Sequence, residues 1–304
     1  MKIVVIGSSN TDMIIKVPRI PRPGETILGG RFMTAAGGKG ANQAVAAARA
    51  GGDVTFIACV GEDSIGTESL EGFKKGGIDV RLISRDPDYP SGVALIFVSD
   101  EGENSIAVAS GANMSLTPDR IADNKDVFHS ADMLVMQLES PLETVKAAAE
   151  IATEKGIPVI LNPAPAQLLP DDLLEKVDIL TPNESEAEIL TGIPVSGIDS
   201  ARAAAIVLHE KGVGKVIITL GSKGAFVSAL DMQGLVPGFQ VEAVDTTAAG
   251  DVFNGTLSVA LSEGRDLEQA VRFANAAAAI SVTKAGAQPS APKRTEIECF
   301  LREA

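Results

Sequence analysis

The sequence predicts an α/β fold built on a mainly parallel sheet with helices on both faces. Short apolar runs of strand length alternate along the chain with segments in which apolar residues recur at helical spacing. A strand–helix–strand order of this kind needs crossover connections, which pair the strands in parallel and place helices over the sheet. In such a sheet, ligands are expected at the carboxyl ends of the strands.

The first apolar run, from Met1 to Gly7, is typical of a buried strand rather than of a signal peptide. Further strands are predicted at Val54–Val60, Asp132–Leu138, Ile157–Leu161, Val177–Leu180 and Lys215–Leu220. Helices are predicted at Ala41–Ala50, Leu142–Lys155, Glu184–Leu190 and Ala201–Lys211. Another helix is expected to start near Asp251, because apolar residues recur at helical spacing from Val252 to Leu261.

Two segments, residues 13–33 and 91–109, interrupt this order. The first carries three prolines. The second alternates between apolar and polar residues, turns through Asp100–Glu103 and alternates again, which predicts a hairpin. Together they are expected to form a small β-layer outside the main sheet. No linker or internal repeat separates them, so residues 1–304 are predicted to form one domain that carries two insertions.

Composition excludes several classes of protein. The 304 residues are 45% hydrophobic, enough to bury one large core. A net charge of −14 disfavours nucleic acid and anionic membranes as partners. No apolar run reaches the roughly 18 residues of a membrane span, and the protein is expected in the cytoplasm. The two distant cysteines, Cys59 and Cys299, indicate reduced structural thiols rather than a disulfide framework.

The histidine content narrows the chemistry. His129 and His209 are the only histidines, and neither has a partner at the spacing of a metal site or a catalytic triad. A zinc site, a Ser–His pair or a Cys–His pair is therefore not expected, and a general base must be a carboxylate or a lysine. The chain also lacks the P-loop motif and the dinucleotide-binding glycine pattern.

The segment Asp245–Asp251 carries the most chemical information. Two carboxylates bracket five small residues, and Asp251 falls in the first turn of the predicted helix. Unpaired N–H groups and the positive end of the helix dipole favour an anion there. An anion site beside an ionised Asp251 suits phosphoryl transfer, with the carboxylate as base for the attacking hydroxyl. The alternative is a carboxylate that only caps the helix.

Other polar groups follow predicted strands or precede helices. Gly37–Asn42 starts the first helix, where glycines allow close approach of a ligand and Lys39 adds a mobile charge; the alternative is a tight turn. Asn10 and Asp12 follow the first strand and are suited to two hydroxyls of a polyol, or to an Asx-turn. Glu139 follows a strand in the same way, with a helix cap as its alternative.

Two further groups suit a nucleotide and its metal. Asn183 and Glu186 follow the strand that ends near Thr181, where they could orient phosphate and a hydrated metal or simply cap a helix. The glycine-rich stretch Thr219–Gly224 joins two strands, and its alternative is an ordinary hairpin turn.

These residues together resemble the ribokinases of the PfkB carbohydrate kinase family, in order and spacing, from residue 3 to about residue 301. The resemblance rests on Gly38–Gln43, Met136–Glu139, Thr181–Glu184, Ile218–Gly221, Asp245–Asp251 with Asn254 and Gly255, and Gly286–Ser290. It implies a ribokinase-like three-layer α/β/α sandwich with a small β-sheet lid, and a homodimer formed through the lids.

The resemblance also implies roles for individual residues. Asp251 is similar to the family's catalytic base, and Ala248, Ala249 and Gly250 to its anion hole. The implied sugar-binding residues are Asn10, Asp12, Gly38, Lys39, Gly40, Asn42, Glu139 and Asp251. The implied ATP-binding residues are Asn183, Thr219, Leu220, Gly221, Ser222, Lys223, Gly224, Gly250, Asp251 and Asn275, the last at a position where the family often has His.

Two metal sites are implied in the same way. Asn183 with Glu186 resembles the motif that helps to place hydrated Mg²⁺. A loop resembling the family's K⁺ site comprises Asp245, Thr247, Ser281, Lys284, Gly286 and Ser290, acting largely through backbone oxygens. Neither role follows from spacing alone.

The expected reaction is transfer of the γ-phosphoryl group of ATP to O5 of D-ribose, with Asp251 ionised at neutral pH because a helix N-terminus favours the charged form. Other acceptors within the family are 2-deoxyribose, fructose and adenosine. Adenosine fits less well, because the chain has no tryptophan and one tyrosine for stacking. A non-enzymatic sugar sensor and an unrelated metabolite-binding protein are further alternatives.

Overall fold

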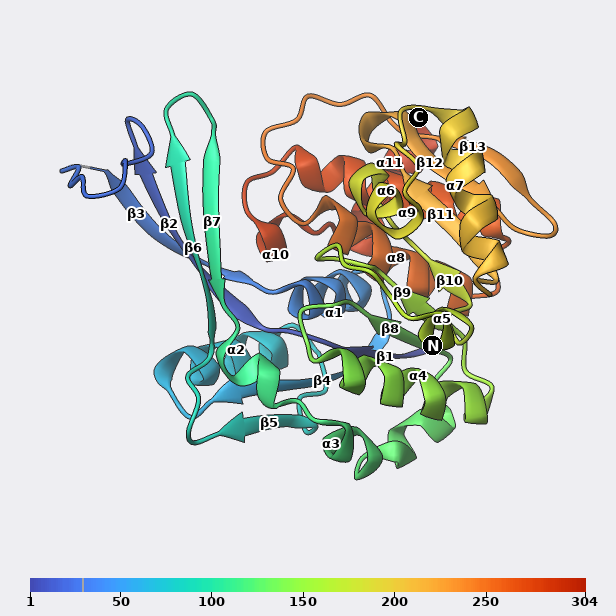
Figure 1. Ribbon diagram of the computed structural model, residues 1–304, viewed down its shortest axis with the longest axis horizontal. Coiled ribbons are helices and arrows are strands. Elements are labelled where there is room, and N and C mark those ends of the chain that lie inside the picture. Colours follow the sequence, from blue (N-terminus) through green and yellow to red (C-terminus); the bar gives the residue numbers. More distant parts are fainter. Residues whose placement is uncertain (29) are drawn as a thin grey trace.

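The computed structural model describes residues 1–28 and 30–304. Gly29, which falls in the predicted insertion 13–33, lies outside the described residues. Within them, a large sheet holds nine strands in the order β13-β12-β11-β10-β9-β8-β1-β4-β5 (Figure 1). The strands are β1 (Lys2–Ile6), β4 (Asp53–Gly61), β5 (Ile83–Asp86), β8 (Met133–Met136), β9 (Val159–Leu161), β10 (Ile179–Leu180), β11 (Lys215–Thr219), β12 (Gly224–Ser228) and β13 (Gln233–Pro237).

The predicted parallel sheet is confirmed from β11 to β5, since each neighbouring pair in that stretch is parallel. Only β11–β12 and β12–β13, at one edge, are antiparallel. The strand bounds are shorter than the apolar runs suggest. The run 132–138 forms a strand only over Met133–Met136, and 177–180 contributes the two residues of β10.

Helices cover both faces of the large sheet (Figure 1). The helices are α1 (Lys39–Arg49), α2 (Ser64–Lys75), α3 (Pro118–Ala122), α4 (Leu142–Lys155), α5 (Asp171–Leu174), α6 (Glu184–Thr191), α7 (Ile198–Glu210), α8 (Ala249–Ser262), α9 (Leu267–Val282), α10 (Ala287–Ser290) and α11 (Arg294–Glu303). No helix in the described ranges is long and apolar enough to cross a membrane.

The two faces of the sheet bury separate hydrophobic cores. Successive side chains of a strand point to opposite faces, and β1 shows this directly. Ile3 and Val5 pack with residues of α1, α8 and α9. Val4 and Ile6 pack with residues of α4 and α7 on the other face. Strands buried on both faces explain why these runs are apolar throughout.

The two interrupting segments form a separate four-stranded sheet in the order β3-β2-β6-β7. Its strands are β2 (Asn10–Val17), β3 (Arg31–Gly37), β6 (Gly92–Ser99) and β7 (Asn104–Ala109). The predicted hairpin is confirmed by the antiparallel pairing of β6 with β7. This small sheet projects away from the large one (Figure 1).

The small sheet begins earlier than the sequence predicts. β2 starts at Asn10, only three residues after β1 ends, and pairs with both β3 and β6. Asn10 and Asp12 therefore lie on a strand, and the Asx-turn alternative is wrong. This placement brings their side chains to the carboxyl edge of the large sheet.

Close backbone approach fixes the start of α1. Gly38 precedes the helix with φ +88°, and a Cβ there would lie 2.6 Å from the backbone nitrogen of Asn10. A Cβ on Gly40 would lie 2.6 Å from the carbonyl carbon of Gly7. Glycine is therefore required at both positions, and α1 starts directly against the end of β1.

Candidate active site

Asp251 lies in the first turn of α8, as predicted, and its carboxylate is held by α1. The Asn42 side chain donates to Oδ2 at 2.9 Å, and Gln43 donates to Oδ1 at 3.0 Å. The side chain is buried, with 5% of its residue surface exposed. The two helices meet closely because Gly255 of α8 has no side chain; a Cβ there would lie 2.4 Å from the Gln43 carbonyl oxygen. Asp251 is therefore more than a cap.

The backbone before Asp251 turns sharply. Ala248 precedes α8 with φ +60° and ψ +13°, the left-handed region that alanine rarely adopts. The N–H groups of the first turn of a helix have no partner within the helix. Those of Gly250 and Asp251 are therefore available to an anion at this end of α8.

Two cavities meet at this helix end. A polar cavity of about 170 Å³ lies on the Asp251 side, and a more apolar one of about 250 Å³ lies beyond it. The residues that line both are Thr219, Thr246, Ala249 and Gly250. The cavities are thus neighbours, joined at the N-terminus of α8.

The polar cavity gathers residues from five segments that are far apart in sequence. It is lined, besides the shared residues, by Lys39, Asn162, Ala164, Thr181, Asn183, Glu186, Ala248, Asp251 and Asn254. Most of these positions follow the carboxyl ends of strands, where the fold was expected to place a site.

The apolar cavity contains most of the predicted nucleotide-binding residues. It is lined by Gly221, Ser222, Gly224 and Asn275, and by Gly238, Phe239, Val241, Ala243, Phe253, Ala278, Ala279 and Val282. The Asn275 side chain donates to the carbonyls of Val236 and Pro237, both at 3.2 Å. Two predicted residues do not line the cavity: Leu220, which packs into the hydrophobic core, and Lys223, which is exposed.

Glu139 accepts hydrogen bonds that tie together the ends of β1 and α1. Its Oε2 accepts from the Ser8 hydroxyl at 2.5 Å and from the Lys39 N–H at 3.0 Å. It does not cap α4, the helix that follows it, because α4 starts later, after Pro141, and has no side-chain cap. Instead it accepts from the first N–H of α1, so its contact with a helix end is made across the fold.

Asn10 and Asp12 approach the same region from β2. The Asn10 amide oxygen accepts from the side chain of Asn113 at 2.7 Å. The Asp12 carboxylate lies over Gly37, where a Cβ would be 2.4 Å from its Oδ1. Glycine at position 37 therefore leaves the space that this carboxylate occupies.

Four carboxylates, those of Asp12, Glu139, Glu186 and Asp251, interact electrostatically with Lys39 here. Burial, with the nearby charges of Glu139 and Asp251, raises the pKa of Asp12 from 3.8 to about 6, although Lys39 opposes the shift. Burial alone would lower the pKa of Lys39, but the surrounding carboxylates raise it above its ordinary value, Asp251 most of all. The lysine is therefore held as a cation among the carboxylates.

Burial also raises the pKa of Asp251, although the charge of Lys39 and the hydrogen bonds from Asn42 and Gln43 each act to lower it. The helix N-terminus is expected to favour the charged form of Asp251, but burial acts in the opposite direction. The charged form depends on these donors and on Lys39, because desolvation is the largest influence.

Asn183 and Glu186 form a capping box at the start of α6. The Asn183 side chain accepts from the Glu186 N–H, and the Glu186 carboxylate accepts from the Asn183 N–H, both at 2.8 Å. Both residues also line the polar cavity. The cap alternative is correct, but it holds these two side chains at the cavity wall rather than removing them from it.

The loop before α8 is linked to the loop before α10. The Asp245 carboxylate accepts from the N–H groups of Thr247 at 2.9 Å and Gly286 at 2.8 Å. These bonds lower the pKa of Asp245, although burial acts in the other direction. Three other residues implied for this loop bond elsewhere through their side chains: Ser281 to Ala278, Ser290 to Ala287 and Lys284 to Glu296.

Several buried residues in the site have no assigned role in the sequence analysis. Gln43, Gln137, Asn162, Thr181 and Asn254 connect Asp251 to the strand ends through side-chain bonds. Gln43, Gln137, Thr181 and Asn254 lie in motifs that carry the family resemblance, whereas Asn162 lies in none of them. These side chains come from distant segments, so hydropathy and spacing do not reveal their contacts.

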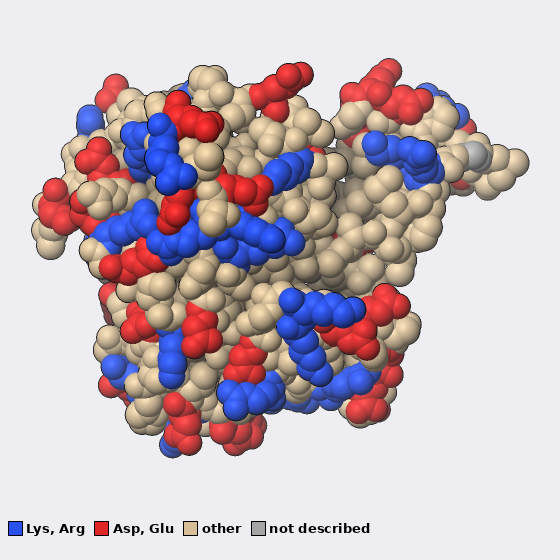
Figure 2. Space-filling view, turned by 180° about the vertical axis from the view of Figure 1, so that it is seen from behind, with Lys and Arg blue, Asp and Glu red and all other residues tan. Residues whose placement is uncertain are grey.

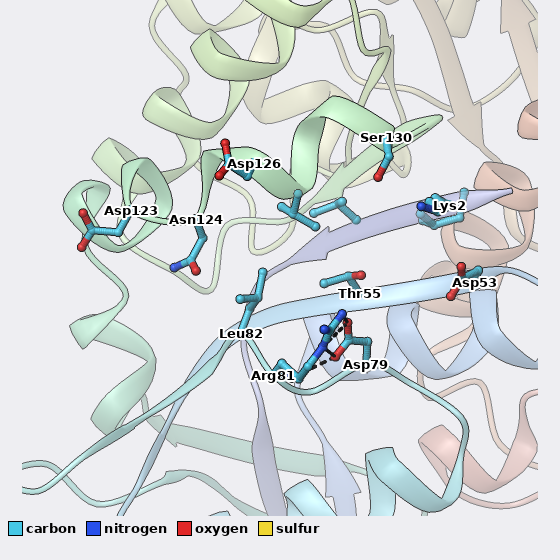
Figure 3. A pocket seen from close by; sticks show the side chains of 13 residues that line it. Lys2, Asp53, Thr55, Asp79, Arg81, Leu82, Asp123, Asn124, Asp126 and Ser130 are labelled. Carbon is cyan, nitrogen blue, oxygen red and sulfur yellow. Dashed lines mark hydrogen bonds and ion pairs between the residues drawn. The ribbon is translucent and has the colours of Figure 1, made fainter.

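A larger cavity, about 470 Å³, lies at the opposite, amino-terminal edge of β1 and β4 (Figure 3). Lys2, Asp53, Arg81 and Asp126 contribute to its wall. Arg81 is already paired with Asp79 at 2.7 Å. None of the predicted site residues lines this cavity, and the described residues contain no cluster of three His, Cys, Asp or Glu side chains suited to a metal.

Comparison with known proteins shows the family and the fold of this chain. The profile of the pfkB family carbohydrate kinases matches residues 1–294. The chain is 51% identical to a ribokinase of Haemophilus influenzae over 302 residues, covering 99% of each chain, and 41% identical to a deoxyribokinase of Salmonella typhi, again covering 99% of each. An Arabidopsis thaliana ribokinase complexed with ribose and ATP superimposes with a TM-score of 0.91 at 35% identity, covering 99% of this chain and 98% of that one. This chain belongs to the PfkB carbohydrate kinase family.

Proposed function

We propose that this protein transfers the γ-phosphoryl group of ATP to O5 of D-ribose, with Asp251 as the general base. The observation that carries the proposal is the meeting of the two cavities at the N-terminus of α8. A nucleotide in the apolar cavity would direct its phosphates toward Gly250, and a sugar in the polar region would present a hydroxyl to Asp251. The family, and the ribokinases among the relatives, support the same assignment.

The sugar site consists of hydrogen-bonding groups that suit a small polyol. Asp12 and Glu139 offer carboxylate acceptors. The Asn42 amide oxygen is buried and has no hydrogen-bond partner within the described residues. A buried orphan acceptor is costly, and a sugar hydroxyl that donates to it would remove that cost.

The transfer step follows from the position of Asp251. Asp251 accepts the proton of the O5 hydroxyl as the bond from O5 to the γ-phosphorus forms. The bond from the γ-phosphorus to the bridging oxygen breaks, and ADP leaves. The N–H groups at the start of α8 stabilise charge on the transferred group, so most of the rate enhancement comes from positioning and charge stabilisation.

Asn183 and Glu186 would help to hold Mg²⁺ with the phosphates. Their oxygen atoms belong to the donor class that Mg²⁺ prefers, and both line the cavity beside Asp251. The ion would neutralise phosphate charge. Because Glu186 is held by the capping box, it needs no rearrangement to face the cavity.

A monovalent cation, K⁺, would bind at the loop of Asp245, Thr247 and Gly286. The Asp245 carboxylate already joins the two loops that would surround the ion. The implied ligands Ser281, Lys284 and Ser290 would act through backbone oxygens, since their side chains bond elsewhere. The loop leads directly into α8, so its order would affect the anion-binding N–H groups.

The small sheet would act as a lid and as the interface of a homodimer. Its exposed side chains include Phe32 (64% exposed) and Leu95 (49%) on one face, and Ile106 (56%) and Val108 (52%) on the other. Figure 2 shows charged side chains at the outer end of the projecting part and a mostly uncharged stretch nearer the body of the molecule. A second copy of this sheet would cover the face of Ile106 and Val108. A kinase that uses ATP in this way is expected to work in the cytoplasm.

The test is ADP release by the purified protein with Mg-ATP and K⁺ over D-ribose, 2-deoxyribose, D-fructose and adenosine. A strong preference for ribose is the expected result. A preference for 2-deoxyribose would keep the mechanism but change the substrate, which the deoxyribokinase relative makes the nearest alternative. Binding of a sugar without turnover would instead support a sensor.

A further inference from the structure

Gln43 is a fully buried amide that touches the base, with 0% of its surface exposed. Its Nε2 donates to Asp251 Oδ1 at 3.0 Å and to Asn162 Oδ1 at 3.2 Å. Its Oε1 accepts from the Gln137 side chain at 2.6 Å. Every hydrogen-bonding end of this amide is therefore committed to a neighbour of the active site.

The bond from Gln137 determines which end of the Gln43 amide faces Asp251. If the amide were reversed, its oxygen would face a carboxylate oxygen, and two acceptors would meet in a buried site. The reversed amide would also present its nitrogen to the Gln137 donor. Gln137 itself fits only because Gly7 has no side chain, since a Cβ there would lie 2.1 Å from the Gln137 Oε1.

We propose that Gln43 is a positioning residue for Asp251: oriented by Gln137, it aims the carboxylate into the polar cavity and keeps it able to accept the substrate's proton. The inference rests on the proposed function, in which Asp251 is the base. Each carboxylate oxygen accepts one bond, Oδ1 from Gln43 and Oδ2 from Asn42, and each keeps a lone pair for the cavity.

The charges around Asp251 explain why a neutral donor is needed. Lys39 from α1 faces Asp251 as a cation, while Glu139 after β8, Asp12 from β2 and Glu186 from α6 add carboxylates that interact with it or with Lys39. Burial favours protonation, and a protonated Asp251 cannot act as a base. Gln43 supports the charged form without adding a charge that would compete with Lys39.

The test is Gln43→Met, which keeps an unbranched side chain of similar shape and removes the donor. At pH 7 we expect kcat to fall about tenfold, with KM for ribose and for ATP changed less than about threefold. The acidic limb of the pH profile of kcat should move upward by about one pH unit. Gln137→Met should shift the limb in the same direction by less. Gln269→Met, the same change on the exposed surface of α9, should alter nothing.

A second measurement separates this inference from the choice of substrate. The ionisation of Asp251 can be followed by NMR of its carboxyl carbon, assigned with Asp251→Asn, in the absence of any sugar. The inference requires a higher midpoint in Gln43→Met than in the native protein. An unchanged midpoint together with an unchanged acidic limb would overturn it. If Gln43→Met fails to fold, Gln137→Met decides in the same two ways. If the native protein phosphorylates none of the sugars, that result would instead overturn the proposed function.

Discussion

Asp12→Asn should stabilise the folded protein at neutral and alkaline pH. In the native fold, burial and the nearby charges of Glu139 and Asp251 raise the pKa of Asp12 from 3.8 to about 6. A pKa change of this size corresponds to a loss of about 3 kcal/mol in the free energy of unfolding when Asp12 is ionised. Asp12 is partly open to solvent, and screening reduces this loss to about 1–2 kcal/mol. Asparagine keeps the shape of the side chain and removes the charge.

The sign follows from linkage. Between pH 4 and pH 6 the folded state holds the Asp12 proton more tightly than the unfolded state, so the native protein loses stability as pH rises through this range. Above pH 6 the penalty is complete, and below pH 4 it is absent. The gain in free energy of unfolding of Asp12→Asn over the native protein should therefore be full at pH 8, about half as large at pH 5 and near zero at pH 4.

The assay is urea denaturation of both proteins at pH 8, 5 and 4, with Asp100→Asn, an exposed carboxylate in the β6–β7 turn, as the control. The control should show no such pH-dependent advantage. In a separate thermal unfolding experiment at pH 8, the melting temperature of Asp12→Asn should exceed that of the native protein by about 2 °C. A variant that is less stable at pH 8, or whose stability difference does not depend on pH, would refute the reasoning. KM for ribose should rise in the same variant, because the charged acceptor is lost.

Three further predictions test the base, the packing behind it and the exposed sheet. Asp251→Asn should bind ribose, measured by calorimetry, with an affinity within about threefold of that of the native protein, but its turnover, measured by ADP release, should fall about 10²–10⁴-fold. The control Asp231→Asn, at an exposed position, should stay active. Near-native turnover of Asp251→Asn would remove the base assignment. Gly255→Ala should lower the free energy of unfolding, measured by urea denaturation, by about 1–3 kcal/mol, because the new Cβ meets the backbone of α1. The control Gly72→Ala has nothing within 4 Å of its Cβ and should raise the same quantity by about 0.5–1 kcal/mol. Equal effects would contradict the close approach of α1 and α8. Ile106→Lys on β7 should sediment as a monomer in sedimentation velocity. The control Ile206→Lys, at a position 50% exposed on α7, should remain a dimer. If the native protein itself sediments as a monomer, the proposed interface is contradicted.

The mainly parallel sheet and most of its strands could be predicted because these strands are buried on both faces and therefore consist of apolar runs. The start of α8 could be predicted for a related reason. The residues from Val252 to Leu261 face a core and recur at helical spacing, which places Asp251 in the first turn.

The position of Asn10 and Asp12 on β2 could not be predicted in this way. Most residues of β2 are only partly buried, so the strand shows no clear apolar alternation. Its register comes from pairing with β3 and β6, which are distant in sequence. The hairpin between β11 and β12 agrees with the alternative given for Thr219–Gly224, but which of its residues face the cavity could not be predicted, because that depends on the pairing of the two strands.

The contacts that hold Asp251 were the least accessible to sequence reasoning. Gln43 and Gln137 are polar residues in apolar surroundings, and a composition argument would place them at the surface. They are buried in a chain of hydrogen bonds in which Gln137 donates to Gln43 and Gln43 donates to Asp251. Such pairing depends on tertiary packing, which periodicity along one chain does not encode.

The most direct test of the central claim is the position of the phosphate in the product. The native protein would be incubated with ribose, Mg-ATP and K⁺, and the product examined by ³¹P–¹H NMR correlation. Phosphorus coupled to the two protons on C5 of ribose, with one ADP formed per sugar phosphorylated, is the predicted result. Phosphate on another hydroxyl, or inorganic phosphate as the main product, would contradict transfer to the hydroxyl that Asp251 is placed to deprotonate.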